Sequence, residues 1–200
     1  IDEEKIREKM SIYVNAISEN FPSGSMPLYA SKALCFKKIY TIAAEEHMGV
    51  DVVSPGELYT ALQAGFPMEK VFFHGNNKTD ADIEFAIENH IGYFVCDNLD
   101  ELDAIDETAE RHGIVQKILL RLTPGIDPHT HVKISTGKVD SKFGIAIETG
   151  QADEAIKAAL DKKNVKLCGY HCHIGSQTFD IKPFVDGAEI MLKYISHIKE

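Results

Sequence analysis

A lysine and a histidine-rich segment are the parts of this 200-residue chain best suited to chemistry. Lys32 ends an apolar run that begins at Leu28, and a lysine at the end of a buried strand needs a reason to be there. One interpretation is a lysine that keeps its ammonium group in water while its stem covers apolar surface. The other is an amine that partial burial makes reactive toward a carbonyl compound, with which it can form an imine. The run alone leaves both interpretations open.

Two cysteines and two histidines follow one another closely between positions 168 and 173. All four are of a type that binds zinc. Successive side chains of a strand point to opposite faces, so Cys168 and Cys172 would lie opposite His171 and His173. Four ligands could not then converge, and we predict no metal site. Both histidines would instead face one side of the sheet, and Ser176 beyond them could offer a hydroxyl to an anion.

Three further polar residues stand at or near the ends of apolar runs. Asp51 opens one run, His74 follows the next, and Arg121 lies inside a third. An arginine in a core strand must be paired, and either a bound anion or Asp51 could be its partner. Each signal is weak by itself. Together with Lys32 and His173 they predict a site, because the ends of successive parallel strands meet at one face of a barrel.

The elements that would position these residues alternate between short apolar strands and amphipathic helices. The strands are continuous apolar runs, which indicates a parallel sheet covered on both sides. Regular alternation of this kind predicts an α/β fold, either a doubly wound sheet or a (β/α)₈ barrel. Helix starts are marked by Ser54, Thr79 and Asn98, each with an acidic residue three positions later. The predicted strands are Pro27–Lys32, Val50–Val53, Val71–His74, Tyr93–Cys96, Ile118–Leu122 and Lys166–His173.

One long connection interrupts the repeat. Only one helix, Ala152–Leu160, is predicted between Leu122 and Lys166, and a loop covers residues 123–149. Loops of this length in compact domains are usually functional. This loop follows a strand and contains residues that could reach a ligand, namely His129, His131, Ser135, Thr136, Lys142 and Phe143.

The composition narrows the class of partner. The chain has 21 Lys and Arg against 31 Asp and Glu, a net charge of −10, which argues against nucleic acid as a partner. It contains no apolar run of the roughly 18 residues that a membrane span requires. Four cysteines make no secreted disulfide framework, so we predict a cytoplasmic location. The chain begins at Ile1 without an initiator methionine, and we expect it to be part of a longer protein.

Five motifs, in order and at suitable spacing, together resemble one enzyme family. They are similar to motifs of the alanine-racemase-like (fold type III) pyridoxal-phosphate decarboxylases, and among these to the diaminopimelate decarboxylases. The resemblance runs over essentially the whole chain. The motifs are Tyr29–Ala33, Asp51–Leu58, His74–Lys78, Ile134–Gly137 with Asp140–Gly144, and His171–Gln177.

The resemblance implies a cofactor, a reaction and a set of site residues. The cofactor is pyridoxal 5'-phosphate, and the reaction is decarboxylation of meso-2,6-diaminopimelate, a small amino acid, to L-lysine in the last step of lysine biosynthesis. The complete protein would be a homodimeric lyase. By resemblance Lys32 binds the cofactor, His173 stacks on its ring and Ser176 lies near its phosphate, while Asp51, His74 and Arg121 line the pocket.

The chain lacks other parts of the family pattern. It has no triple-glycine run after residue 177, no Glu-Pro-Gly-Arg-like strand and no C-terminal β-domain, and Leu34 replaces a common Asn. Residues 1–200 are therefore expected to form one truncated cofactor-binding domain, about six of eight barrel units, inactive alone.

Two alternatives stay open. One is a related decarboxylase acting on carboxynorspermidine, arginine or ornithine, although the 130–144 loop and the His171–Gln177 motif favour diaminopimelate. The other is a non-catalytic paralogue that binds a partner, which retention of Lys32 and His173 argues against.

Overall fold

The computed structural model describes residues 1–125, 144–175 and 178–199, and it contains one parallel sheet with helices around it. The strands are β1 (Leu28–Ala30), β2 (Gly49–Val52), β3 (Val71–Phe73), β4 (Tyr93–Cys96), β5 (Gln116–Thr123), β6 (Ile145–Ala146) and β7 (Val165–His171). The helices are α1 (Glu3–Asn20), α2 (Lys37–Glu45), α3 (Pro55–Gln63), α4 (Asp80–Glu88), α5 (Leu99–Arg111), α6 (Gln151–Asp161) and α7 (Lys182–Ile198). Short 3₁₀ turns cover Ser31–Ala33 and Met68–Lys70.

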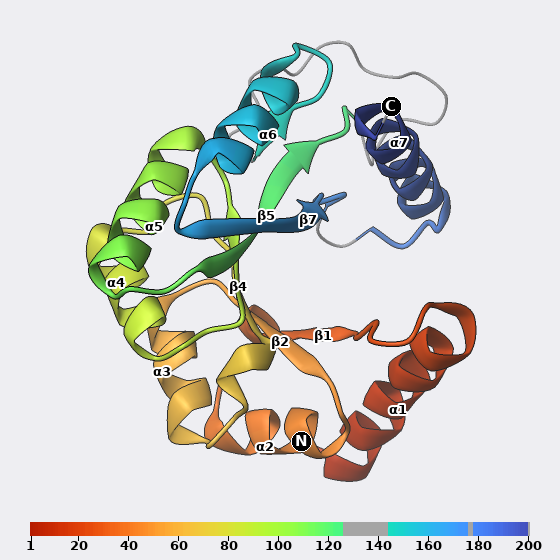
Figure 1. Cartoon of the computed structure of the whole chain (residues 1–200). Helices are drawn as coiled ribbons and strands as arrows, with labels where there is room; N and C mark the ends of the chain where they lie inside the picture. Colours follow the sequence, from red (N-terminus) through yellow and green to blue (C-terminus); the bar gives the residue numbers. More distant parts are fainter. Residues whose placement is uncertain (126–143, 176–177, 200) are drawn as a thin grey trace.

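The sheet curves, and its helices lie along the outside of the curve. Strands β1 to β5 are neighbours in chain order, and β5 also pairs with β7 and, at its end, with β6. Helices α2 to α6 follow the outer face, while α1 and α7 lie at the two ends of the arc (Figure 1). The prediction of a partial (β/α)₈ barrel is confirmed. The sequence missed β6, because two residues are too short to stand out as an apolar run.

The core forms between the outer face of the sheet and the helices. Val50, Val52, Val71 and Phe73 are at most 1% exposed and belong to one cluster with the helices. The residues between them face the other way. Cross-strand register aligns Asp51 with Phe72 and Phe72 with Tyr93, and the rings of Phe72 and Tyr93 stack at 4.4 Å. Since side chains alternate along a strand, this inner face is where Asp51 must lie.

The predicted helix starts are correct, but two of them have an unexpected partner. Thr79 and Asp82 form the reciprocal bonds of a capping box. The side chains of Ser54 and Asn98 likewise accept a bond from the third residue of their helices. The glutamates at these third positions, however, accept from the N–H before the cap. Glu57 bonds to Val53 and Glu101 to Asp97, so each carboxylate ties the end of a strand to the following helix.

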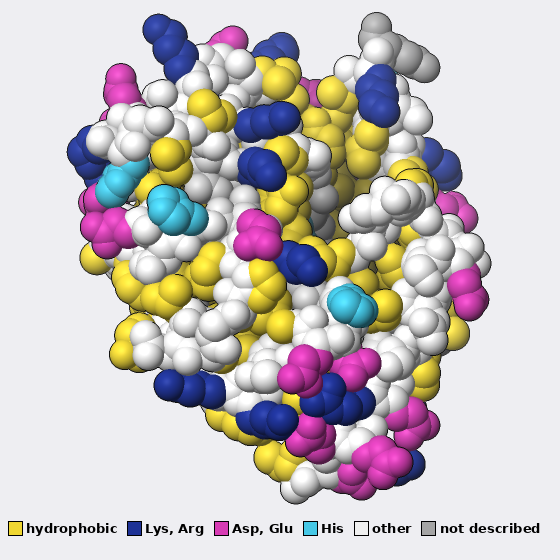
Figure 2. Space-filling view, turned by 60° about the horizontal axis from the view of Figure 1, so that its bottom comes forward, with side chains coloured by type: hydrophobic (Ala, Val, Ile, Leu, Met, Phe, Trp, Pro, Cys, Tyr) yellow, Lys and Arg dark blue, Asp and Glu magenta, His cyan; other side chains and the backbone are white. Residues whose placement is uncertain are grey.

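We expect the isolated chain to self-associate. In the described ranges β1 pairs only with β2 and β7 only with β5, so each leaves one edge without a strand partner. Unpaired strand edges act as templates for other chains. Apolar side chains are also open to solvent in a hollow on one face (Figure 2). Light scattering after gel filtration should show species larger than 22.2 kDa that bind a hydrophobic dye. A dye-negative monomer would contradict the expectation.

Within the described residues, no helix has both the length and the apolar character needed to cross a bilayer.

Candidate active site

The predicted residues at the strand ends come together at one end of the sheet. The carboxylate Oδ1 of Asp51, on β2, lies 3.6 Å from Nε2 of His74, which follows β3. The ring of His74 meets that of His171, the last residue of β7, edge to face at 4.7 Å. Cross-strand register places Arg121 of β5 beside His171. Four strand ends thus supply one cluster, as the barrel interpretation predicted.

Lys32 is close to this cluster but is not placed as predicted. Strand β1 ends at Ala30, and Lys32 lies on the 3₁₀ turn that follows, where it is exposed. The assignment of Lys32 to a buried strand end was therefore wrong. Its positive charge nevertheless reaches these groups. It opposes the burial that raises the pKa of Asp51, and it adds to the burial that lowers the pKa of His74 and His173. Lys32 is thus exposed to solvent while its charge acts on the residues of the cluster.

Three buried polar atoms in this cluster have no hydrogen-bond partner among the described residues. They are Oδ1 of Asp51, Nε2 of His74 and Nδ1 of His171. Buried polar atoms are nearly always paired, because leaving one unpaired costs about 1–3 kcal/mol. Two of these atoms lie on β2 and β7 and the third lies just after β3. Together they indicate a place built to receive a polar ligand.

Burial shifts the protonation of these groups toward their neutral forms. It raises the pKa of Asp51 to about 6, opposed by the charge of Lys32. Burial also lowers the pKa of His74 to about 2, and the nearby His171 adds to this effect. Burial likewise lowers the pKa of His171 to about 4, and the charge of Arg121 adds to it. At neutral pH both imidazoles are uncharged, and each can accept one hydrogen bond and donate another. The positive charge of the site comes from Lys32 and Arg121.

These shifts predict how stability depends on pH. Between pH 4 and 6.5, His74 and His171 bind fewer protons in the folded protein than in the unfolded chain. Their contribution to the free energy of unfolding is therefore complete above pH 6.5 and is lost as the pH falls. Asp51 opposes them between 3.8 and about 6, because its folded form takes up a proton earlier. For these three groups the net difference between about pH 4 and 6 is one proton, which corresponds to a loss from them of about 1.4 kcal/mol per pH unit.

Urea unfolding of the protein at pH 4.5, 5.5 and 6.5 measures this slope. His171→Gln should make it shallower and Asp51→Asn steeper, because each removes one of the opposing groups. An unchanged slope in both variants would contradict the assignment.

The partner of Arg121 is a residue that the sequence interpretation did not include. Its Nη1 donates to Oδ1 of Asp97 at 2.9 Å, and the two side chains are 9% and 5% exposed. Of the two predicted partners, Asp51 does not form this bond. Asp97 directly follows β4, as His74 follows β3, so its position carried the same signal of a polar residue at a strand end. It stands next to the helix cap Asn98, whose capping pattern was the only role predicted for this turn.

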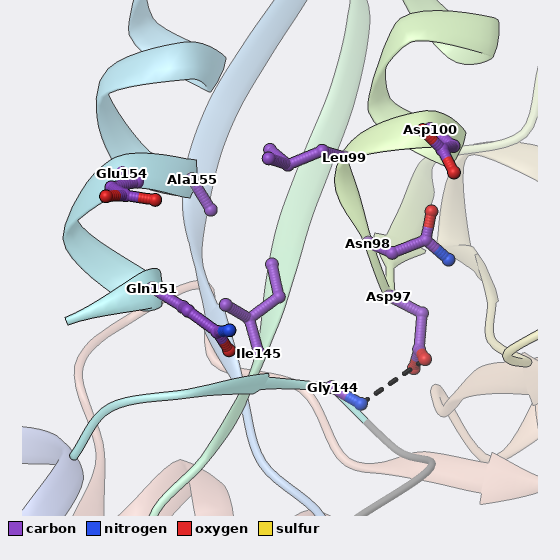
Figure 3. A pocket seen from close by; sticks show the side chains of 9 residues that line it. All are labelled: Asp97, Asn98, Leu99, Asp100, Gly144, Ile145, Gln151, Glu154 and Ala155. Atoms are coloured by element: carbon purple, nitrogen blue, oxygen red, sulfur yellow. Dashed lines mark hydrogen bonds between the residues drawn. The ribbon is translucent and has the colours of Figure 1, made fainter. Parts of the chain in front are cut away.

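Asp97 also reaches a pocket between α5 and α6. Its Oδ2 accepts a bond from the N–H of Gly144 at 3.3 Å, drawn as a dashed line in Figure 3. Gly144 has φ +80°, and a Cβ there would lie 2.8 Å from the carbonyl oxygen of Arg121, so only glycine fits. The pocket encloses about 330 Å³ and is lined by Asp97, Asn98, Leu99, Asp100, Gly144, Ile145, Gln151, Glu154 and Ala155.

His173 and Ser176 are the remaining predicted site residues. His173 lies two residues beyond the end of β7 and is exposed, so the predicted strand Lys166–His173 was two residues too long. Ser176 and the loop residues 126–143 lie outside the described residues.

Comparison with known proteins places these observations in a family. Residues 3–200 match the family described as "Pyridoxal-dependent decarboxylase, pyridoxal binding domain". The chain is 46% identical over 195 residues to diaminopimelate decarboxylase of Bacillus methanolicus, covering 98% of this chain and 45% of that protein. The chain thus spans about half the length of the curated relatives it matches.

Solved structures agree with the fold. The crystal structure of the Methanocaldococcus jannaschii diaminopimelate decarboxylase with L-lysine superposes with a TM-score of 0.88 at 38% identity, covering all of this chain and 46% of that one. A Vibrio vulnificus lysine/ornithine decarboxylase matches with a TM-score of 0.72 over 96% of this chain and 47% of its own. At 23% identity that second match supports the fold alone.

Proposed function

The chain belongs to the pyridoxal-dependent decarboxylases, as their pyridoxal-binding domain, and on that premise we propose that the protein decarboxylates meso-2,6-diaminopimelate to L-lysine. The observation that carries the choice of substrate is 46% identity to diaminopimelate decarboxylase across 98% of the chain. We further propose that residues 1–200 act as one domain.

The residues present fit the cofactor. Pyridoxal phosphate carries an aldehyde, ring polar atoms and a phosphate, and the site offers a reachable amine, unpartnered buried polar atoms and an arginine. In the proposal Lys32 holds the aldehyde carbon, His173 packs on the ring and Ser176 lies near the phosphate, while Asp51, His74 and Arg121 line the pocket. When bound, the cofactor supplies an electron-withdrawing ring that accepts the electron pair of the broken C–C bond.

The protein's own part in the reaction is to bind, orient and manage protons. Arg121 is held by Asp97 beside His171, so its charge is fixed before an anionic group arrives. His74 and His171 are uncharged at neutral pH and can orient polar atoms without competing with Lys32 for negative charge. Asp51, with a pKa of about 6, can take up or release a proton near physiological pH.

Growth complementation tests the proposal directly. The full product of the gene, meaning these residues with whatever the gene encodes beyond them, should restore growth without lysine to a bacterium lacking diaminopimelate decarboxylase. The purified protein should release carbon dioxide from meso-diaminopimelate in preference to ornithine, arginine or carboxynorspermidine. Preference for one of the other three would favour the related-decarboxylase alternative, and turnover of none would favour the non-catalytic one.

The two histidines of the last motif should differ in their effect. In the full gene product His173→Ala should weaken cofactor retention and slow turnover, because the packing of an aromatic ring is lost. His171→Ala should do less to either, since its ring packs against His74 within the protein. Dialysis followed by absorbance measures retention. Equal losses from both variants would show that the stacking role is misassigned or shared.

The assembly and location are proposals of the same kind. We expect a homodimer, which light scattering on the full gene product tests, and a cytoplasmic location, which cell fractionation tests. The expected partner is a small amino acid, with neither nucleic acid nor membrane, and no metal, so a chelator should leave turnover intact.

A further inference from the structure

An ion pair buried behind the site has no part in the chemistry described so far. Nζ of Lys78, in the turn after β3, lies 2.7 Å from Oε1 of Glu101, in the first turn of α5. The two side chains are 1% and 4% exposed. A buried ion pair is weak evidence for stability, because removing two charges from water costs about as much as their attraction returns. The pair needs another explanation.

The hydrogen bonds of Lys78 show what the pair holds. Besides Glu101, its ammonium group donates to the carbonyl oxygen of Gly75 at 2.8 Å and to that of Val95 at 2.9 Å. These carbonyls belong to the turn after β3 and to the end of β4. An ammonium group has three protons, so every one is used. An apolar residue at position 78 would leave two carbonyls without this donor.

Glu101 extends the contacts toward Arg121. Its Oε2 accepts from the backbone N–H of Asp97 at 3.4 Å. The side chain of Asp97 in turn accepts from Arg121 and from the N–H of Gly144. A continuous series of hydrogen bonds therefore runs from Gly75, through the ion pair, to Arg121.

Both ends of this series adjoin residues of the site. Gly75 directly follows His74 and has φ +121°, a backbone conformation that glycine adopts readily and other residues rarely do. The Lys78 bond to its carbonyl sets the course of the backbone as it leaves His74. At the other end, Asp97 fixes the guanidinium of Arg121. In the described part of the chain, the hydrogen bonds of the Lys78 and Glu101 side chains go to each other and to the backbone of Gly75, Val95 and Asp97.

We propose that Lys78 and Glu101 are positioning residues, which hold the His74 turn and the Asp97–Arg121 pair in the arrangement that receives the ligand. The identity of that ligand as pyridoxal phosphate rests on the proposed function. The positioning of His74 by the ion pair does not.

Two variants of the full gene product test it, Lys78→Met and the milder Glu101→Gln, each with two readouts. The first readout is the pH titration of the His74 ring by NMR. Burial lowers the pKa of His74, and the charges of His171 and Lys78 add to this, so Lys78→Met raises it through the lost charge alone. Glu101→Gln keeps the charge of Lys78, so a rise in that variant reports that the turn has been freed. The second is the dissociation constant of pyridoxal phosphate, which should increase about tenfold in Lys78→Met and less in Glu101→Gln.

The matched control is Lys182→Met, which breaks an exposed ion pair with Asp186 and should change neither readout. If the substrate assignment is wrong but the protein is a related decarboxylase, both readouts will still change in the variants. If the parent protein does not bind pyridoxal phosphate at all, the titration of His74 will still shift in Glu101→Gln. The positioning role is overturned if both readouts stay at the parent value while only the unfolding midpoint falls. It is also overturned if neither variant folds, because the pair is then a global support of the fold.

Discussion

Lys32→Ala should abolish the absorbance of lysine-bound pyridoxal phosphate in the full gene product and reduce turnover by about a thousandfold or more. Lys32 is exposed on its 3₁₀ turn, and its charge acts on Asp51, His74 and His173. No other described lysine is an evident substitute. Lys78 uses all its protons within the fold, and Lys38 lies on α2, where it pairs with Glu3.

Chemical trapping identifies the lysine independently of turnover. Borohydride reduction of the cofactor-loaded protein, followed by peptide mapping, should place the pyridoxyl mass on Lys32. Lys38→Ala is the control, because it removes a neighbouring exposed amine and should change neither absorbance nor labelling. A label on Lys37, Lys38 or Lys78 in the parent protein would show that the assignment of Lys32 is wrong.

Arg121→Met should be among the most destabilising single changes in the described residues, at about 3–5 kcal/mol. Methionine approximates the volume of the arginine stem but leaves the buried carboxylate of Asp97 without its cation, and Asp97 is only 6% exposed. The midpoint of urea unfolding at pH 7 measures the loss. Cofactor affinity should fall as well, since the charge beside His171 is gone.

A second substitution separates the ion pair from its packing. Asp97→Asn added to Arg121→Met removes the uncompensated charge, so the double variant should recover part of the lost stability. Arg111→Met is the control, because that arginine pairs with Glu84 at the surface and should leave the unfolding midpoint unchanged. A double variant less stable than Arg121→Met would show that the charge of Asp97 is not the cause.

The sequence by itself determined the class of fold and the approximate place of the site. Apolar runs predicted every strand except β6, and local capping patterns predicted the starts of α3, α4 and α5. These signals are local, since a strand shows its burial in its own residues and a cap lies within one turn of its helix. Polar residues at strand ends could be placed together because parallel strands share a direction, which puts Asp51, His74 and Arg121 at one end of the sheet.

Only the tertiary structure decided which of these residues touch and which are exposed. Whether Lys32 continued the strand or left it depended on where pairing between β1 and β2 stopped, at Ala30. The choice of Asp97 rather than Asp51 for Arg121 depended on the packing of β4 and β5, whose residues are over twenty positions apart. The Lys78–Glu101 pair likewise joins the turn after β3 to the start of α5, two segments that are distant in the sequence. Contacts of this kind follow from register and sheet curvature, which no single stretch of sequence contains.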